Sequence, residues 1–227
     1  MKFVVIEGLD GSGKSTQIKL LRNYLEKNNI SYKYLHFPRT NSPVYGEMVA
    51  KFLRGDLGKI DEVDPYLVAL LYAGDRENAK KTILDWLNNY LVLVDRYVYS
   101  NMAFQCAKID DLTEKNKLRN WIRYMEFKYF NIPIPDLNLF LDVPFEFTKH
   151  KLSKNREGND REYLNGKTDI HEESLDFQEK VRQEYLHLAQ NEPNYKIIDC
   201  KKSETEILDP QEILNRIVGE CRQNNIF

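Results

Sequence analysis

Cysteine is scarce in this sequence, and its distribution excludes two classes of protein. Among 227 residues there are three cysteines, Cys106, Cys200 and Cys221. They are too few and too scattered for a disulfide framework or for a zinc cluster. We therefore predict that the protein works in the reducing cytoplasm.

Long apolar runs, clustered histidines and an excess of one charge are also missing. No uninterrupted apolar run approaches the roughly 20 residues that a membrane span needs, and the run in MKFVVIEG is too short for a signal peptide. The four histidines lack metal-ligand spacing, so we expect no metal held by protein side chains alone. With 33 basic and 35 acidic residues, we expect neither a nucleic-acid nor a membrane partner.

What is present is a regular alternation of short apolar runs and long amphipathic stretches. It predicts an α/β fold with a parallel sheet covered on both faces, in a single domain over residues 1–227. The expected strands are Lys2–Glu7, Ser31–Phe37, Leu91–Val94, Leu137–Asp142 and Tyr195–Asp199. The expected helices are 14–28, Pro43–Leu53, Pro65–Tyr90, Tyr97–Ala107, Thr113–Phe130, one opening at Pro144, Ile170–Gln190 and Pro210–Arg222.

The segment from Gly8 to Ser15 matches the phosphate-loop pattern GxxxxGK[ST] between an expected strand and an expected helix. In that setting backbone N–H groups and the helix N-terminus point at phosphate oxygens. Lys14 should reach the β- and γ-phosphates of a nucleotide, and Ser15 should hold Mg²⁺. The alternative is a chance match on a glycine-rich turn. The motif does not separate kinases from GTPases, ATPases or sulfotransferase-like proteins. The residues expected to bind the ATP phosphates are Gly8, Leu9, Asp10, Gly11, Ser12, Gly13, Lys14, Ser15 and Thr16.

Arginines follow two expected strands, at the edge of the sheet where open α/β proteins bind ligands. Arg39 follows the second strand, Arg96 follows the third, and Arg76 lies on the helix between them. Together with Lys14 they could neutralise two facing polyphosphate groups; the alternative is surface salt bridges. Asp95 could cap a helix beginning at Tyr97, orient Arg96, or bind the water shell of the metal.

The polar segment 154–168 carries Lys154, Arg156, Arg161 and Lys167. We interpret it as a lid that closes over ATP and excludes water. A solvated charged loop would have the same composition.

An ordered set of motifs resembles the thymidylate kinase (dTMP kinase) family of nucleoside monophosphate kinases over nearly the whole chain. The motifs are EGLDGSGKSTQ at 7–17, FPR at 37–39, LLYAGDR at 70–76, VDRYVYSNMAFQ at 94–105 and PDLNLFLDV at 135–143. The resemblance implies a three-layer fold with a five-stranded parallel sheet, a mobile lid at about 154–168, and a homodimer. It also implies transfer of the γ-phosphoryl group from ATP, with Mg²⁺, to dTMP, which gives dTDP for dTTP biosynthesis.

The resemblance also implies roles for individual residues. Tyr72 would stack on thymine, Gln105 would read the pyrimidine edge, and Asp10 would accept a hydrogen bond from the sugar 3′-hydroxyl. Packing and a local turn are the structural alternatives for Tyr72 and Asp10. The positions matching dTMP-binding residues are Asp10, Phe37, Arg39, Tyr72, Arg76, Arg96, Ser100, Asn101 and Gln105, and the matching catalytic positions are Asp10, Lys14, Arg96 and Arg156.

The chain departs from the family pattern at two places. Some relatives have an arginine where this chain has Gly11, and relatives without it place a catalytic arginine in the lid. Arg156, or otherwise Arg161, should then do that work. After FPR the chain continues as TNSPVYG instead of through a glutamate, which leaves the partner of Arg39 open.

Two other functions fit parts of the pattern. A deoxynucleoside kinase would need a general base, Glu7 or Asp95, beside the sugar 5′-hydroxyl. A nucleotide-binding regulator would bind ATP without transferring phosphate. The homodimer could use aromatic residues of segment 101–130, although the same side chains could form the core. The aromatic residues in question are Phe104, Trp121, Tyr124, Phe127 and Tyr129.

Overall fold

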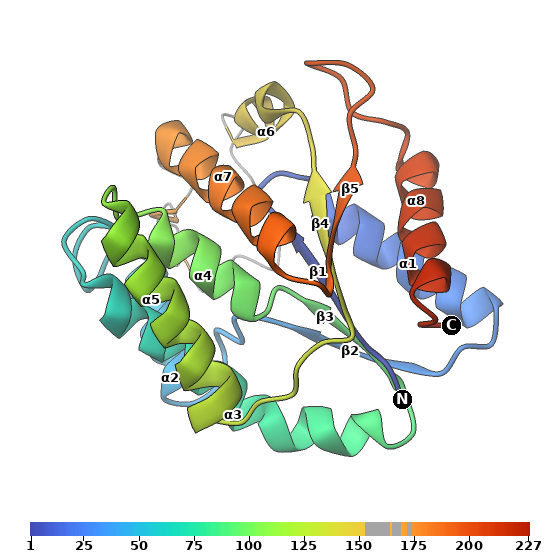
Figure 1. Cartoon of the computed structure of the whole chain (residues 1–227), viewed down its shortest axis with the longest axis horizontal. Helices are drawn as coiled ribbons and strands as arrows, with labels where there is room; N and C mark the ends of the chain where they lie inside the picture. Colours follow the sequence, from blue (N-terminus) through green and yellow to red (C-terminus); the bar gives the residue numbers. More distant parts are fainter. Residues whose placement is uncertain (153–163, 165–168, 172–173) are drawn as a thin grey trace.

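The computed structural model describes residues 1–152, 164, 169–171 and 174–227 (Figure 1). The predicted lid, with Arg156 and Arg161, lies outside the described residues except for Leu164, which is buried.

The centre of the fold is a five-stranded, entirely parallel sheet, which confirms the predicted fold class. The strands are β1 (Phe3–Gly8), β2 (Tyr32–His36), β3 (Leu91–Asp95), β4 (Leu137–Asp142) and β5 (Tyr195–Asp199). Their order is β2-β3-β1-β4-β5. The three inner strands are buried at every position, as their uninterrupted apolar sequences predicted.

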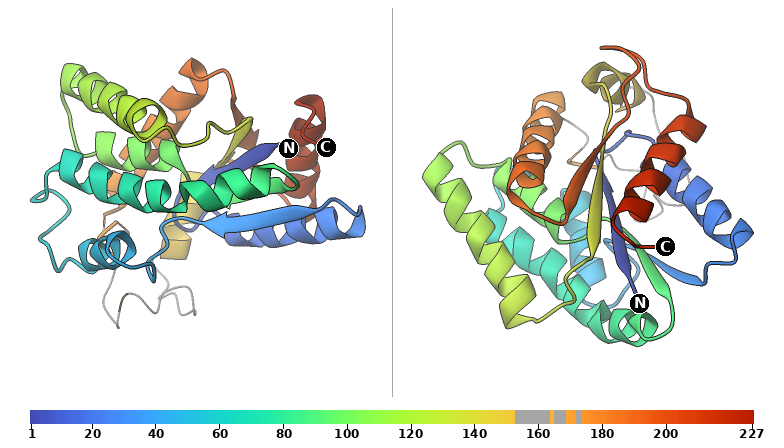
Figure 2. Two further views of the ribbon diagram at one scale, coloured as in Figure 1. Left: turned by 90° about the horizontal axis from the view of Figure 1, so that it is seen from below. Right: turned by 45° about the vertical axis from the view of Figure 1, so that its right-hand side comes forward.

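Helices cover both faces of the sheet because alternate residues of each strand point to opposite sides. The helices are α1 (Lys14–Lys27), α2 (Tyr45–Leu53), α3 (Pro65–Leu87), α4 (Val98–Cys106), α5 (Leu112–Tyr124), α6 (Phe145–Leu152), α7 (Leu175–Asn191) and α8 (Pro210–Gln223). Helices α1 and α8 lie on one face of the sheet, and α3, α4, α5 and α7 lie on the other (Figures 1 and 2). Val4 and Ile6 belong to the core of the first face, and Phe3 and Val5 belong to the core of the second. In the described part of the chain, none of the helices has the length and hydropathy of a membrane span.

Most helix boundaries differ from the predicted ones by one to three residues, and two helices differ more, for local reasons. Helix α7 begins at Leu175 and not at Ile170, because the Ser174 hydroxyl accepts a hydrogen bond from the Phe177 N–H and caps the helix there. The helix predicted to reach Phe130 changes at Met125 into a π-helix, Met125–Tyr129. Such π turns are often found at functional sites.

Gly74 allows helices α2 and α3 to pack closely beside the carboxyl ends of the strands. A Cβ atom at this position would overlap the ring of Tyr45 on α2. The close contact fixes the part of α3 that carries Tyr72, Asp75 and Arg76. Gly219 on α8, by contrast, has no neighbouring atom in the described residues where a Cβ would stand.

Gly74 and Gly219 should therefore respond with opposite signs to the same substitution. Gly219→Ala should stabilise the protein by about 0.5–1 kcal/mol, because alanine is the better helix former. Gly74→Ala should destabilise it by about 1–3 kcal/mol, because the ring of Tyr45 must move. Urea unfolding of both variants measures this difference. Equal stabilisation by both would contradict the close packing of α2 on α3.

Candidate active site

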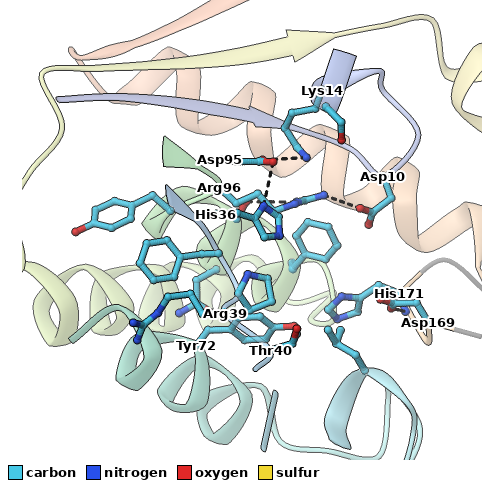
Figure 3. Close-up of a pocket in the computed structure, with 18 of the residues that line it drawn as sticks. Asp10, Lys14, His36, Arg39, Thr40, Tyr72, Asp95, Arg96, Asp169 and His171 are labelled. Carbon is cyan, nitrogen blue, oxygen red and sulfur yellow. Dashed lines mark hydrogen bonds and ion pairs between the residues drawn. The ribbon is translucent and has the colours of Figure 1, made fainter. Parts of the chain in front are cut away.

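One cavity of about 860 Å³ opens at the carboxyl ends of strands β1, β2 and β3. It brings together nearly all the predicted site residues that the structure describes (Figure 3). Gly8 is the exception, since it is buried in β1 opposite Leu141. A side chain at Gly8 would press on the Ser12 hydroxyl. The absence of a side chain at Gly8 therefore allows the loop to fold back over the end of β1. The predicted residues that line the cavity are Leu9, Asp10, Gly11, Ser12, Gly13, Lys14, Ser15, Thr16, Phe37, Arg39, Tyr72, Arg76, Asp95, Arg96, Ser100, Asn101 and Gln105.

The phosphate loop has the backbone shape that its glycines allow. Gly11 and Gly13 both have φ of 80°, a left-handed conformation that few other residues adopt without strain. Helix α1 begins directly after Gly13, so its first N–H groups face the cavity edge. This arrangement is typical of an anion-binding loop.

Lys14 forms an ion pair with Asp95 at the end of β3, with Nζ and Oδ1 3.0 Å apart. His36 Nδ1 lies 3.0 Å from the other oxygen of the same carboxylate. Burial by itself would raise the pKa of Asp95, but Lys14, His36 and Arg96 together hold it below its usual range. Asp95 is therefore an ionised group at neutral pH.

Of the roles considered for Asp95, that of capping the next helix is wrong. Helix α4 begins at Val98, and Tyr97 occupies its N-cap position without a side-chain cap. The Tyr97 N–H donates instead to the carboxylate of Glu7, at 3.0 Å. Asp95 is directed to Lys14 because β3 ends beside the phosphate loop.

Arg96 forms an ion pair with Asp10, its Nη2 donating to Oδ1 at 2.7 Å. Its Nη1 donates to the Ser100 and Tyr185 hydroxyls at 3.4 and 3.3 Å, and the guanidinium lies 5.0 Å over the ring of Phe104. The backbone of Arg96 has φ of 62°, a conformation that costs a residue other than glycine on the order of 1–3 kcal/mol. The surrounding contacts hold it there.

Arg39 is bound from several sides by Asp75, a partner that sequence reasoning did not find. The Arg39 backbone N–H and Nε each donate to the Asp75 carboxylate, at 2.8 and 2.9 Å. Nη2 donates to the Asp75 carbonyl and to Asn78. Asp75 thus fixes both the backbone and the side chain of the residue that follows β2.

Arg76 is completely buried and forms a bidentate ion pair with Glu126. Its Nε donates to Oε2 at 2.5 Å and its Nη2 donates to Oε1 at 2.7 Å. The π-helix places Glu126 beneath the cavity, where the carboxylate also accepts a hydrogen bond from Asn101 Nδ2 at 2.9 Å. No sequence spacing indicated this pair. The arginines do form ion pairs, as the alternative interpretation held, but the pair of Arg76 with Glu126 is in the interior.

The end of the cavity away from the phosphate loop combines aromatic rings with amide and imidazole groups. Both polar atoms of the Gln105 amide and Nε2 of His171 are buried, and the described residues offer them no hydrogen-bond partner. Tyr72 lines the same end, and burial raises the pKa of its hydroxyl well above the usual value. Uncharged hydrogen-bonding groups beside aromatic faces suit a nucleobase.

Asp169 and His171 also line the cavity, although no sequence pattern indicated them. The His171 ring packs among Phe52, Phe104 and Phe177, with ring centroids 4.8–5.8 Å apart. Asp169 accepts a hydrogen bond from the His171 N–H at 2.8 Å. A single histidine in a polar segment carries no signal by which this placement could have been found.

Comparison with known proteins gives a consistent result over most of the chain. A sequence model of the thymidylate kinase family matches residues 6–210. The chain is 34% identical to a probable thymidylate kinase of Saccharolobus solfataricus, over 92% of this chain and 93% of that protein. It is 33% identical to a thymidylate kinase of Ligilactobacillus salivarius, over 96% and 99%. The solved structure of a thymidylate kinase from Candida albicans superposes with a TM-score of 0.71 at 25% identity, covering 99% of this chain and 92% of that one.

The burial of His171 generates a prediction about pH. Burial, with Lys108 nearby, lowers the pKa of His171 to about 3, so unfolded chains bind this proton more readily than folded ones below about pH 6.5. Stability should therefore fall as the pH is lowered from about 6.5, by up to about 1.4 kcal/mol per pH unit from this residue.

Urea unfolding of wild type and His171→Phe between pH 4.5 and 8 measures the contribution of His171 to the pH dependence of stability. The phenylalanine variant should show a shallower decline below pH 6.5, and the two curves should run parallel above it. Identical slopes below pH 6 would show that His171 is not buried as a neutral ring.

Proposed function

Because the chain belongs to the thymidylate kinase family, we propose that it transfers the γ-phosphoryl group of ATP to dTMP, giving ADP and dTDP, the precursor of dTTP. One observation carries the assignment of the site. A phosphate loop and three arginines line one cavity whose opposite end carries an aromatic ring and a buried amide that has no hydrogen-bond partner among the described residues. A donor triphosphate, an acceptor phosphate and a base can each find complementary groups in it.

At the donor end, Lys14 and the N–H groups of the loop would hold the ATP phosphates. The Ser15 hydroxyl and the ionised Asp95 are hard oxygen donors, which fits Mg²⁺ held by Ser15 and, through water, by Asp95. When bound, Mg²⁺ supplies positive charge that neutralises the β- and γ-phosphates. Lys14 would add a second positive charge on the same oxygens.

At the acceptor end, Arg39, Arg76 and Arg96 would bind the dTMP phosphate, with Phe37, Ser100 and Asn101 beside them. Each guanidinium carries five N–H donors, so a phosphate can bind while carboxylates keep the arginines in place. Asp10, held by Arg96, would accept the hydrogen bond of the sugar 3′-hydroxyl.

Base recognition would rest on Tyr72 and Gln105. The ring of Tyr72 would stack on thymine, since an aromatic face binds any base. Leaving a buried donor or acceptor unpaired costs about 1–3 kcal/mol, and the Gln105 amide carries both. A pyrimidine edge offers the complementary acceptor and donor, which favours this ligand over one without polar edge groups.

The reaction itself would need positioning and charge compensation more than a base. The acceptor phosphate is largely dianionic at neutral pH, since its second pKa is about 6, and its oxygen can attack the γ-phosphorus in line. Lys14 and Arg96 would stabilise the charge on the transferring group. A lid arginine, Arg156 in preference to Arg161, would assist; both lie outside the described residues.

The contacts of the two acidic residues argue against a deoxynucleoside kinase. Glu7 is completely buried and already accepts hydrogen bonds from Tyr97 N–H and Ser100. Asp95 is paired with Lys14. Neither is free to take a proton from a sugar hydroxyl.

For the assembly, we propose a homodimer of single-domain subunits spanning 1–227. Tyr124 and Tyr129 expose 61% and 72% of their surface, and Leu67 on α3 exposes 61%. Phe104 and Phe127 are buried in the core. Of the two alternatives considered for them, a subunit contact or the core, the structure therefore favours the core.

The function is tested by incubating the purified protein with ATP and Mg²⁺ and measuring ADP formation with dTMP, dUMP, UMP, CMP, AMP, GMP and thymidine. Turnover with dTMP well above the other acceptors supports the proposal. Turnover with thymidine but not dTMP would move the reaction to the sugar hydroxyl. ATP binding without acceptor-dependent ADP would indicate a nucleotide-binding regulator.

Lys14→Ala should lower kcat by at least about 100-fold, as removal of one preorganised charge stabiliser commonly does. Lys19→Ala is the matched control, because Lys19 is an exposed lysine on the same helix that does not line the cavity. Steady-state kinetics with dTMP, with melting temperatures to verify folding, measure both. Turnover of Lys14→Ala within a few-fold of Lys19→Ala would contradict the role of Lys14.

A further inference from the structure

Helix α7 directs two buried polar side chains at the ion pair between Asp10 and Arg96. Gln178 and Tyr185 are both 0% exposed. They stand seven residues apart, which is two helical turns, so they share one face of the helix. Neither residue belongs to the motifs on which the proposed function rests.

Tyr185 reaches Arg96 through its hydroxyl alone. Its ring stacks on Phe140 of β4, with ring centroids 4.7 Å apart, and this packing needs no polar atom. The hydroxyl accepts a hydrogen bond from Arg96 Nη1 at 3.3 Å and donates to Glu7 Oε2 at 3.2 Å. It also lies 2.7 Å from the Ser100 hydroxyl.

The guanidinium and the carboxylate fix the direction of the hydrogen bonds at the two ends of this cluster, whereas either hydroxyl could donate in the contact between Ser100 and Tyr185. A guanidinium can only donate, so the hydroxyl oxygens of Tyr185 and Ser100 both act as acceptors towards Arg96. Ser100 donates its own proton to Glu7 at 2.5 Å. The two hydroxyls therefore connect the buried carboxylate of Glu7 to the guanidinium of Arg96, and removing one leaves Nη1 with a single partner in the cluster.

Gln178 acts in the same way on the carboxylate of the pair. Its Nε2 lies 3.4 Å from Asp10 Oδ2 and donates to the His171 carbonyl at 2.8 Å. Arg96 binds the other oxygen of Asp10. The amide thus limits rotation of the carboxylate and ties it to the backbone that precedes α7.

We propose that Tyr185 and Gln178 are positioning residues, which hold the Arg96 guanidinium and the Asp10 carboxylate in the geometry that receives the acceptor nucleotide. The inference rests on the proposed function for its kinetic consequence but not for the contact itself. Arg96 needs such support because its backbone is in the left-handed region, with φ of 62°, a conformation that persists only where surrounding contacts hold it.

Tyr185→Phe removes the hydroxyl and keeps the ring on Phe140. Its kcat/KM for dTMP should fall about 10-fold or more, the range expected for one hydrogen bond to a charged group, while its KM for ATP stays within about twofold. Tyr195→Phe is the matched control, since the Tyr195 hydroxyl is also buried but has no hydrogen-bond partner among the described residues. If both variants have the same kcat/KM, the proposal for Tyr185 is wrong.

A double-mutant cycle separates positioning from a general structural effect. In an Arg96→Lys background, Tyr185→Phe should have little further effect on kcat/KM, because the guanidinium that it positions is gone. Gln178→Met, which keeps the side-chain length, should raise KM for dTMP and should lose its effect in an Asp10→Asn background. Equal losses in both backgrounds would mean that these side chains act only on stability.

The ¹⁵N resonances of the Arg96 guanidinium test the contact without any turnover. They are assigned by their loss in Arg96→Lys. Restricted rotation in wild type and Tyr195→Phe, but averaged signals in Tyr185→Phe, would support the proposal. Averaged signals in wild type would overturn it. Absence of dTMP-dependent ADP formation by wild type would refute the proposed function. The ¹⁵N measurement would still decide whether the Tyr185 hydroxyl holds the Arg96 guanidinium in place.

Discussion

The site depends on the pairing of each cation in the cavity with a carboxylate from a different part of the chain. Four positive groups without such partners would repel one another, and burying an unpaired charge costs several kcal/mol. Each pair therefore ties one element of the fold to another, and the charges stay at the carboxyl ends of the strands. The pairs are Lys14 with Asp95, Arg39 with Asp75, Arg76 with Glu126, and Arg96 with Asp10.

The pairing also divides the cavity into regions with different chemistry. Lys14 belongs to the phosphate loop and Asp95 lies beside it, whereas Arg39 and Arg96 follow the second and third strands (Figure 3). The buried pair of Arg76 and Glu126 forms the floor and orders Asn101 through a hydrogen bond. Beyond it lie the neutral side chains of Gln105 and His171, whose buried polar atoms find no hydrogen-bond partner in the part of the chain that the structure describes. In the proposed function, phosphate and base would thereby be directed to opposite ends.

The sequence predicted those parts of the fold and site that depend on local pattern. The apolar runs correctly predicted all five strands. The positions of Arg39 and Arg96 directly after strands correctly predicted that both line one cavity. The partners Asp75, Glu126 and Tyr185 could not be predicted, because they meet the cavity only through the packing of α3, the π-helix and α7. Capping was one of three roles considered for Asp95 because it precedes a helix, but its ion pair with Lys14 across the sheet edge determines where it points. Tyr72 and Gln105 were selected by family resemblance alone, since an aromatic or amide side chain on a helix is more often part of the core.

The most direct test of this account is the contribution of the acceptor phosphate to binding, measured by titration calorimetry of dTMP and thymidine at one salt concentration. Three arginines held in place by carboxylates should make dTMP bind at least about 100-fold more tightly than thymidine, since hydrogen bonds to charged groups contribute about 1.5–3 kcal/mol each. The preference should shrink as salt is added. Equal affinities would mean that the carboxylates neutralise the arginines so fully that they no longer attract the acceptor phosphate. That result would contradict the assignment of this cavity to a nucleoside monophosphate.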